Sequence, residues 1–415
     1  MGQWGAEGDA LHGYTYDQIL SAYYPGTTAG ETNATTIRVL LASGKKQLTI
    51  SSKKPFTVTD GDGIEHTLPA GKTTFGPGLK LAVDGGPAEA LTAPLTFAPG
   101  SGSTLTLGRA YRGEIVVDVP SKKLRAINVL PLEQYLYGVV PAEMPSTWLD
   151  AALAAQAVAA RSYALANEQA AAPFDVYADG RSQAYLGVSA ETPAATEAVD
   201  ETAGEVLLYD GQVADTLFSS STGGLTQSAA DAFGAPGRPY LVSVKDPYDT
   251  ISPYHDWGPV AVTGKTLGQA VGAVGRVVDA AIKRNASKRV KTLKVTSLSA
   301  GALHTVSVGG ASVAAALDLR STWFSVGVLS LQPPVPNPAI SAGTRVKMTG
   351  VVRGVRGVVV QKRVSGGTWQ RLKAVAPGAF TVSVKPKVTT YYRLATAKDA
   401  AASVRIRVAA GTLRQ

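Results

Sequence analysis

One acidic residue, Glu143, lies in a setting that suits catalysis. The chain reads Pro141-Ala-Glu-Met-Pro145 around it, just before an alanine-rich segment that predicts a helix. Proline fixes its own φ and pushes the preceding residue towards extended geometry. A carboxyl held in this frame cannot easily turn aside to pair with a surface lysine. The frame suits a catalytic acid, and the same residues would also suit a sharp turn or a cap for the following helix.

A second candidate is Arg161, which follows Glu143 by 18 residues, a spacing of about five turns at 3.6 residues per helical turn. Its neighbours are small and apolar, so an idle surface position is not expected. Three roles remain open from the sequence. Arg161 would bind a carboxyl or acetamido oxygen of a sugar, hold Glu143 in place, or form a structural salt bridge.

Hydroxyl groups and flexible backbone meet in one loop. It consists of Ser220, Ser221, Thr222, Gly223 and Gly224. Such a loop offers donors and acceptors to sugar hydroxyls, and it would equally form an ordinary turn. No base with triad spacing accompanies these serines, so a serine hydrolase is not expected. Gln3 and Trp4 are candidates to complete a groove, with Trp4 stacking on a sugar face.

The elements that must position these residues follow from periodicity. Apolar spacing predicts a helix from about 147 to 169 with Ser146 as N-cap, and a second helix over 194–202. Strands are expected at 206–209, 213–218 and 293–298. Residues 35–120 alternate between apolar and polar, with glycine-rich turns. After the proline-rich segment 332–338, six short strands follow one another without a helical pattern.

We therefore predict an α+β fold with a mixed central catalytic domain, a β-rich inserted segment and a C-terminal all-β sandwich. The expected parts are an N-terminal arm (1–29), a β-rich segment (30–110), the core domain (111–331), a linker (332–340) and a basic β-sandwich domain (341–415).

Composition narrows the chemistry. The 415-residue chain has no cysteine, which excludes disulfides, thiolate metal ligands and a cysteine nucleophile. The formal net charge is +9, but the segment from Val335 onward holds 15 basic residues and one acid, Asp399. A module of this charge is steered towards polyanions, and a solvated basic surface is the plainer interpretation.

Several ordered motifs in the central segment resemble the SpoIID/LytB family of bacterial cell-wall proteins. They are Tyr111-Arg-Gly-Glu-Ile, Asn128-Val-Leu-Pro-Leu-Glu-Gln-Tyr-Leu with Val140-Pro-Ala-Glu-Met-Pro145, Ala155-Gln-Ala-Val-Ala-Ala-Arg-Ser-Tyr-Ala164, Ser219-Ser-Ser-Thr-Gly-Gly224 with Gly237-Arg-Pro-Tyr-Leu241 and Asp246-Pro-Tyr-Asp249, and Leu319-Arg-Ser-Thr-Trp-Phe324. Residues 1–27 also look like this family, in a motif that usually closes the domain. We predict a permuted order, in which the N-terminal arm docks on the same core.

The resemblance implies a lytic transglycosylase that cuts between N-acetylmuramic acid and N-acetylglucosamine in glycan strands stripped of stem peptides. It assigns Glu143 as the acid that later acts as a base, and no cofactor is implied. Some relatives hold zinc with a histidine before the Ser/Thr-Gly-Gly stretch and with cysteines. Ser219 occupies that position here and cysteine is absent, so we expect no metal.

The expected partners are peptidoglycan glycan strands, anionic cell-wall polymers at the basic C-terminal domain, and a cell-wall amidase, with no nucleic acid. The expected location is extracellular or wall-associated, with an export signal upstream of Met1. Two other functions stay open, because some relatives are described as non-enzymatic amidase enhancers and the chain would also suit a glycan-binding protein. In both cases Glu143 would be structural.

Overall fold

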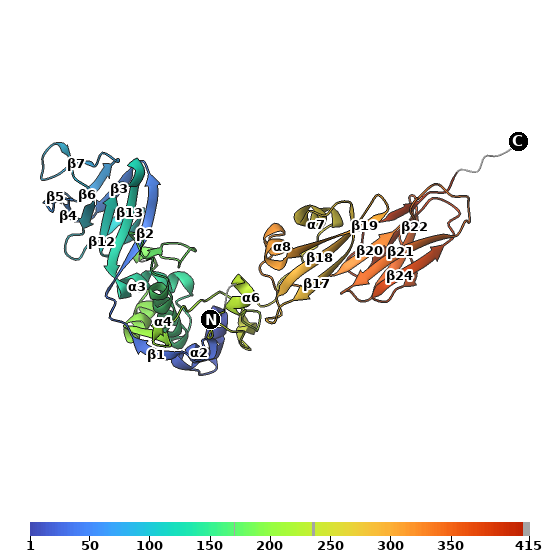
Figure 1. The fold of residues 1–415 in the computed structure, drawn as a ribbon, viewed down its shortest axis with the longest axis horizontal. Helices are drawn as coiled ribbons and strands as arrows, with labels where there is room; N and C mark the ends of the chain where they lie inside the picture. The colour runs from blue at the N-terminus through green and yellow to red at the C-terminus, as the bar shows by residue number, and fades with distance from the viewer. Residues whose placement is uncertain (170, 235–236, 410–415) are drawn as a thin grey trace. The chain divides into compact units, whose positions relative to one another are not determined.

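The computed structural model describes residues 1–169, 171–234 and 237–409 (Figure 1). The chain forms two compact units, Met1–Asp256 and Trp257–Gln415. The fold is α+β, as the sequence predicts, with helices and strands mixed in the first unit and strands dominant in the second. Among the described residues, no helix combines the length and the apolar character needed to cross a membrane. The domain boundaries at 110, 331 and 340 stay predictions.

The helices of the first unit surround a long alanine-rich one. They are α1 (Gln3–Leu11), α2 (Tyr16–Tyr23), α3 (Leu132–Glu143), α4 (Asp150–Ala166), α5 (Pro193–Glu201) and α6 (Ala229–Phe233). Three short 3-10 helices, η1 (Pro120–Lys122), η2 (Gly187–Ala190) and η3 (Asp249–Ile251), accompany them. Helix α4 lies against α1, α2, α3 and α5, because its small side chains let neighbouring backbones approach closely.

A seven-stranded sheet leads into the site. Its order is β14 (Val176–Tyr177), β2 (Thr36–Lys45), β13 (Leu124–Pro131), β12 (Glu114–Asp118), β9 (Leu95–Ala98), β4 (Phe56–Thr59) and β5 (Glu65–Leu68). The interior strand β13 has five buried residues in its eight, and α3 starts at the residue that follows it. The sheet thus fixes where α3 begins and, through its length, where Glu143 lies.

Smaller sheets complete the first unit. One is β11 (Arg109–Tyr111), β10 (Leu105–Leu107), β3 (Leu48–Ser52) and β6 (Gly71–Phe75); another is the pair β7 (Lys80–Ala82) and β8 (Ala88–Ala90). The third is β1 (Thr28–Glu31), β15 (Glu205–Tyr209) and β16 (Gln212–Val213), which joins the N-terminal arm to the core. The predicted strand over 213–218 is wrong beyond Val213, since the chain there turns to contact the arm.

The second unit contains a three-stranded sheet and a sandwich. Strands β17 (Arg276–Arg284), β18 (Val290–Ser299) and β19 (Ala302–Gly309) pack on α7 (Gly264–Val271) and α8 (Gly310–Ala316). The sandwich has sheets β20 (Val328–Gln332), β21 (Val346–Arg353), β24 (Gly378–Val384), and β23 (Gln370–Ala374), β22 (Val359–Val364), β25 (Thr390–Ala395), β26 (Val404–Ile406). All six strands predicted after the linker are confirmed, because inward apolar residues of both sheets share one core.

Candidate functional site

Glu143 is the last residue of α3, where the chain leaves the helix for the short connection to α4. Pro141 lies inside the final helical turn, and Pro145 follows after one residue. Met144 adopts extended geometry, with φ −128° and ψ 146°, as expected for a residue before proline. The two prolines therefore flank an acid that ends helix α3, which the sequence did not predict, and α4 begins only at Asp150.

The carboxyl of Glu143 is half-buried and held at one oxygen. Its Oε1 accepts a hydrogen bond of 2.7 Å from the backbone N–H of Ala184. Neighbouring Gln183 is itself fixed, since its Oε1 accepts from the Tyr135 hydroxyl at 3.0 Å and its Nε2 donates to the Ala160 carbonyl. The segment that orients Glu143 is thus anchored to both α3 and α4.

The second oxygen of Glu143 differs from the first. Within the described part of the chain, no hydrogen bond or ion pair engages Oε2. Half-buried Tyr163 lies in the same electrostatic surroundings: burial raises the pKa of its hydroxyl, and the carboxyls of Asp215 and Glu143 add to the rise. The Glu143 site therefore offers one fixed and one available carboxyl oxygen.

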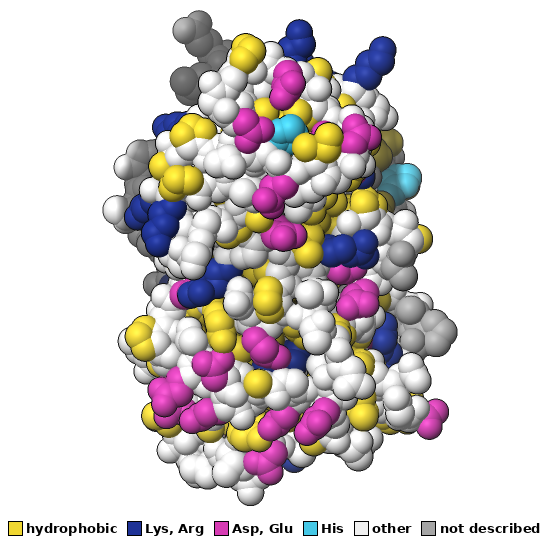
Figure 2. Space-filling model, turned by 90° about the vertical axis from the view of Figure 1, so that its left-hand side faces the viewer, with side chains coloured by type: hydrophobic (Ala, Val, Ile, Leu, Met, Phe, Trp, Pro, Cys, Tyr) yellow, Lys and Arg dark blue, Asp and Glu magenta, His cyan; other side chains and the backbone are white. Residues whose placement is uncertain are grey.

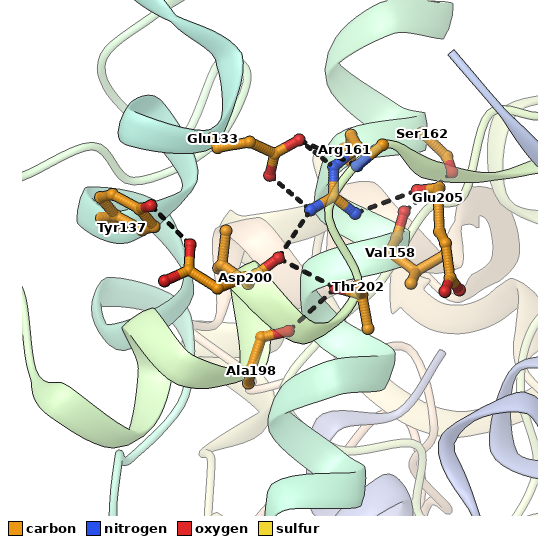
Figure 3. A network of polar contacts seen from close by, with 11 residues as sticks. Glu133, Tyr137, Val158, Arg161, Ser162, Ala198, Asp200, Thr202 and Glu205 are labelled. Atoms are coloured by element: carbon orange, nitrogen blue, oxygen red, sulfur yellow. Dashed lines mark hydrogen bonds and ion pairs between the residues drawn. The ribbon is translucent and has the colours of Figure 1, made fainter.

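Arg161 does not face this site. Its side chain is completely buried, and its Nε and Nη2 donate to the two carboxyl oxygens of Glu133 at 3.0 and 2.6 Å. Further donors reach the carbonyl oxygens of Glu205, at 3.0 Å, and Val199, at 3.3 Å (Figure 3). Of the three roles left open by the sequence, the structural salt bridge is the one that these contacts show. A contact with a sugar or with Glu143 does not fit the complete burial of the Arg161 side chain.

The N-terminal arm docks on the core, as the permuted order predicts. The backbone N–H of Gln3 donates to the Ser219 carbonyl at 2.9 Å, and the backbone N–H of Trp4 donates to the Ser220 carbonyl at 3.0 Å. Gly5 permits this approach, because a Cβ atom there would lie 2.1 Å from Asp246 Oδ1. The arm and the predicted Ser/Thr-Gly-Gly loop are therefore parts of one substructure.

The two arm residues predicted to line a groove have different exposures. Gln3 is buried, and its Nε2 donates to Gln156 Oε1 at 3.4 Å. Trp4 is half-buried and packs edge-to-face on Trp148, with ring centroids 4.7 Å apart and an interplanar angle of 61°. Trp148 lies in the segment that joins α3 to α4, shortly after Glu143. The ring contact between Trp4 and Trp148 therefore packs the arm against this segment.

The loop from Ser220 to Gly224 is organised by a residue that we did not single out from the sequence. Fully buried Asp249 accepts from the Ser221 hydroxyl at 2.9 Å and from the amides of Thr222 and Gly223 at 3.0 and 2.9 Å. Its Oδ2 also lies 2.8 Å from His255 Nδ1. Asp249 belongs to a motif of the family resemblance, but only the fold reveals that it takes donors predicted to face sugar.

Asp246 completes this arrangement beneath the arm. It is almost fully buried, its Oδ2 accepts from the Thr222 hydroxyl at 2.6 Å, and burial raises its pKa. Gly224 lies beside His255, whereas Ser220 is exposed. Of the predicted loop residues, Ser220 thus remains accessible to a ligand, while Ser221, Thr222 and Gly223 use their donors to build the loop.

Acidic groups of α1 also lie at this docking surface. Glu7 Oε2 accepts from the Leu149 amide at 3.0 Å, and burial raises the pKa of Glu7. This contact caps α4 from outside the helix, so the predicted Ser146 cap is wrong and Leu149 takes the N-cap position. Burial and the nearby Asp246 raise the pKa of Asp9 to about 6.

Acidic side chains also gather on the lower part of the face shown in Figure 2. A shallow depression of about 550 Å³ at the start of α5 is lined by Glu191, Thr192, Pro193, Thr196, Glu197, Asp200 and Glu201. Glu143 is not among these residues. Within the described ranges, no group of three or more His, Cys, Asp or Glu side chains is arranged to hold a metal ion.

Comparisons with known proteins give a consistent family. Residues 120–209, which include Glu143 and Arg161, match the family model described as SpoIID, stage II sporulation protein. An uncharacterised protein from Brachyspira hyodysenteriae is 33% identical over 220 residues, covering 51% of this chain and 58% of that protein.

Two relatives from Bacillus subtilis carry functional names. The stage II sporulation protein D is 38% identical over 149 residues, covering 31% of this chain and 42% of that protein. A protein named amidase enhancer is 39% identical over 114 residues, covering 28% of this chain and 15% of that protein. The chain thus spans from about a seventh to somewhat over half of the length of these relatives.

Proposed function

Because this chain belongs to the SpoIID/LytB family, we propose that it acts on the bacterial cell wall as a peptidoglycan lytic transglycosylase with Glu143 as its catalytic acid and base. The bond cleaved would join N-acetylmuramic acid to N-acetylglucosamine in glycan strands without stem peptides. The protein would accordingly work outside the cell or in the wall.

One observation carries this proposal. The Ala184 amide fixes Oε1 of half-buried Glu143 at 2.7 Å, while Oε2 has no hydrogen-bond partner in the described ranges. A general acid needs a set orientation and a free oxygen within reach of the reacting atom. The site also needs no second carboxylate, because a lytic enzyme uses the sugar's own 6-hydroxyl in place of water.

The reaction then proceeds with one side chain. Protonated Glu143 donates its proton to the glycosidic oxygen as the bond from that oxygen to C1 of the muramic acid residue breaks. The 6-hydroxyl oxygen of the same sugar bonds to C1, and its proton passes to the Glu143 carboxylate. A 1,6-anhydro end forms, no water is consumed, and Glu143 returns to its protonated state.

Two accessible groups support a role in holding the glycan. Trp4 presents a half-buried ring beside Trp148, and exposed Ser220 accepts the backbone N–H of Trp4 through its carbonyl oxygen. An aromatic face and a hydroxyl are suited to an apolar sugar face and to its polar edge. We propose Gln3 as an indirect contributor, which positions the arm through Gln156.

Replacement of Glu143 tests the proposal. Glu143→Gln should lower the rate of glycan cleavage by about 10²- to 10⁴-fold, the usual contribution of a general acid, with glycan binding unchanged. Mass spectrometry of digested, peptide-free glycan would count the anhydro ends. Glu197→Gln, at an exposed position of α5, is the matched control and should cleave normally. Continued release of anhydro products by Glu143→Gln would rule out the assigned role.

A non-enzymatic function is the alternative, since one relative is named amidase enhancer. In that case the chain would bind glycan and stimulate a partner amidase, and Glu143 would serve only the fold. Wild-type protein that binds peptide-free glycan but releases no anhydro ends, while accelerating a wall amidase, would favour this alternative.

A further inference from the structure

The outer face of the sheet β23-β22-β25-β26 carries a row of paired arginine and aromatic side chains. Inward residues of these strands, such as Val360, Leu394 and Ile406, are buried in the sandwich core. Because side chains alternate along a strand, their neighbours face the other way. Four of these outer residues, together with Trp369 just before β23, form what we term the arginine ladder: Arg363, Trp369, Tyr391, Arg393 and Arg405.

Strand register holds the ladder in place. Arg363 on β22 pairs directly with Tyr391 on β25, and Tyr391 pairs in turn with Arg405 on β26. Arg393 is two residues from Tyr391 and is opposite Gln361, whose Oε1 accepts from its Nε at 2.8 Å. Since neighbouring strands lie about 4.8 Å apart, Arg363 and Arg405 originate about 10 Å from each other.

Ring contacts orient the guanidinium groups. Arg393 Cζ lies 4.1 Å from the centroid of the Trp369 ring, and Arg363 Cζ lies 4.8 Å from the same centroid. Tyr391 receives Arg363 at 5.6 Å and Arg405 at 5.8 Å. Cation–π contacts stabilise these side chains without neutralising them, so three positive charges are pre-organised on one face.

The ladder has no counter-charge of its own. In the described part of the chain, Arg363, Arg393 and Arg405 form no ion pair, and Asp399 is the only acid from Val335 onward. Arg353 on the opposite sheet shows the contrast, since Asp279 binds its guanidinium at 2.8 Å. Three oriented arginines without carboxylates indicate an anionic ligand from outside the chain.

We propose that the arginine ladder binds a phosphodiester-linked polymer of the bacterial wall, at a site distinct from the glycan site around Glu143. The inference rests on the proposed function only for the place where the protein acts. A guanidinium forms two parallel hydrogen bonds with one phosphate, which favours phosphodiesters over polymers with diffuse charge. The distance between strands suits a ligand that repeats its charges along a line.

The positions of the arginines over the aromatic rings argue against single-stranded nucleic acid as the ligand of the arginine ladder. Proteins that bind such strands offer free aromatic faces on which bases stack. Here Trp369 and Tyr391 are already covered by arginines, so the ladder offers guanidinium groups and few free ring faces. A phosphodiester chain without bases matches this surface better.

Binding of purified poly(glycerol phosphate) to the full chain tests the proposal by isothermal titration calorimetry. The combined variant Arg363→Gln, Arg393→Gln, Arg405→Gln should bind roughly tenfold or more weakly, and its slope of log K against log salt should fall by about 2. The control variant Arg345→Gln, Lys347→Gln, Lys385→Gln removes equal charge next to the other sheet and should change binding less than about threefold. Thermal unfolding would verify that both variants are folded.

Two results would overturn the inference. Equal weakening in both variants would mean general charge attraction, and tighter binding of poly(U) RNA than of poly(glycerol phosphate) would mean a nucleic-acid surface. Glycan cleavage measured in the same samples separates the two proposals. Cleavage without ladder-dependent binding would remove the ladder site alone, whereas ladder-dependent binding without cleavage would remove the transglycosylase alone.

Discussion

Helix α3 carries a glutamate at each end, and the two differ in how fully their carboxyl oxygens are paired. Glu133 lies in the first turn and gives both oxygens to Arg161, with Oε1 also accepting from the Gly204 amide at 3.1 Å. Glu143 lies in the last turn, about 15 Å further along the axis, and has one amide contact. One end of the helix is committed to the fold, and the other retains an available carboxyl oxygen.

The difference lies in what the rest of the chain brings to each end. At Glu133 a guanidinium from α4 is buried among backbone carbonyls of α5 and β15, where a lone charge would be very costly. At Glu143 the described part of the chain supplies one backbone amide and no ion-pair partner. A polar group that is fully paired inside a protein builds structure, and one with unused capacity at a partly open position can serve chemistry.

The largest expected effect is at Glu133. Glu133→Gln leaves the Arg161 cation buried without a counter-charge and should lower the free energy of unfolding by about 3–5 kcal/mol. Glu143→Gln should change the free energy of unfolding by no more than about 0.5 kcal/mol. Only one hydrogen bond is affected, and the side-chain oxygen of the glutamine can still accept it from the Ala184 backbone N–H. Urea unfolding of both variants measures the comparison directly. Similar losses in the two variants would erase the distinction between the helix ends.

A smaller loss is expected from the other partner. Arg161→Met removes the buried charge, and because 27% of the Glu133 side chain is exposed, water can solvate the carboxylate that remains. The expected destabilisation is about 2–3 kcal/mol. Combining Arg161→Met with Glu133→Gln should cost less than Glu133→Gln alone, because no unpaired cation is left. Additive losses in the urea experiment would contradict a direct coupling between the two residues.

Arg181→Met is the control for that experiment. Its partner Asp179 and Arg181 itself are both more than half exposed, so the pair is screened by water. The variant should unfold within about 1 kcal/mol of the wild type. A larger effect would mean that arginine removal destabilises this protein irrespective of burial.

Local signals predicted much of this comparison. Helix α5 and the sandwich strands follow the periodicity of their apolar residues, and the prolines around Glu143 fix that turn by their own geometry. The arm motif at Gln3 and Trp4 was recognisable, and its docking at Ser219 and Ser220 confirms the prediction that the arm packs on the core. In each case the deciding residues are close together in the chain or are parts of one motif.

Long-range partners were beyond the reach of such signals. Arg161 has the same sequence neighbours whether it meets a sugar or Glu133, which is 28 positions away. Asp249 takes the donors of Ser221 and Gly223 because the fold places it below them, and Glu7 replaces the expected Ser146 cap from 142 positions away. A residue's role changes with its partner, and partner choice is decided by the fold.

Asp9 extends the comparison to a buried acid without an ion pair among the described residues. Its folded-state pKa is about 6, above the ordinary value near 4, so the folded state holds the proton more tightly than the unfolded state. Its contribution to stability is therefore present below about pH 4 and is lost as the pH rises to 6.

Asp9→Asn removes this titration. The variant should match the wild type near pH 4 and exceed it at pH 7 by about 1 kcal/mol, a value reduced for the water that still reaches α1. Urea unfolding at pH 4.5, 5.5 and 7 measures the change, with Glu197→Gln as the exposed control. A variant that is less stable than wild type at pH 7 would mean that the Asp9 carboxylate is paired in the folded state, as the Glu133 carboxylate is. The hydrogen bonds and ion pairs seen in the structure would then not suffice to tell an acid that stabilises the fold from one that does not.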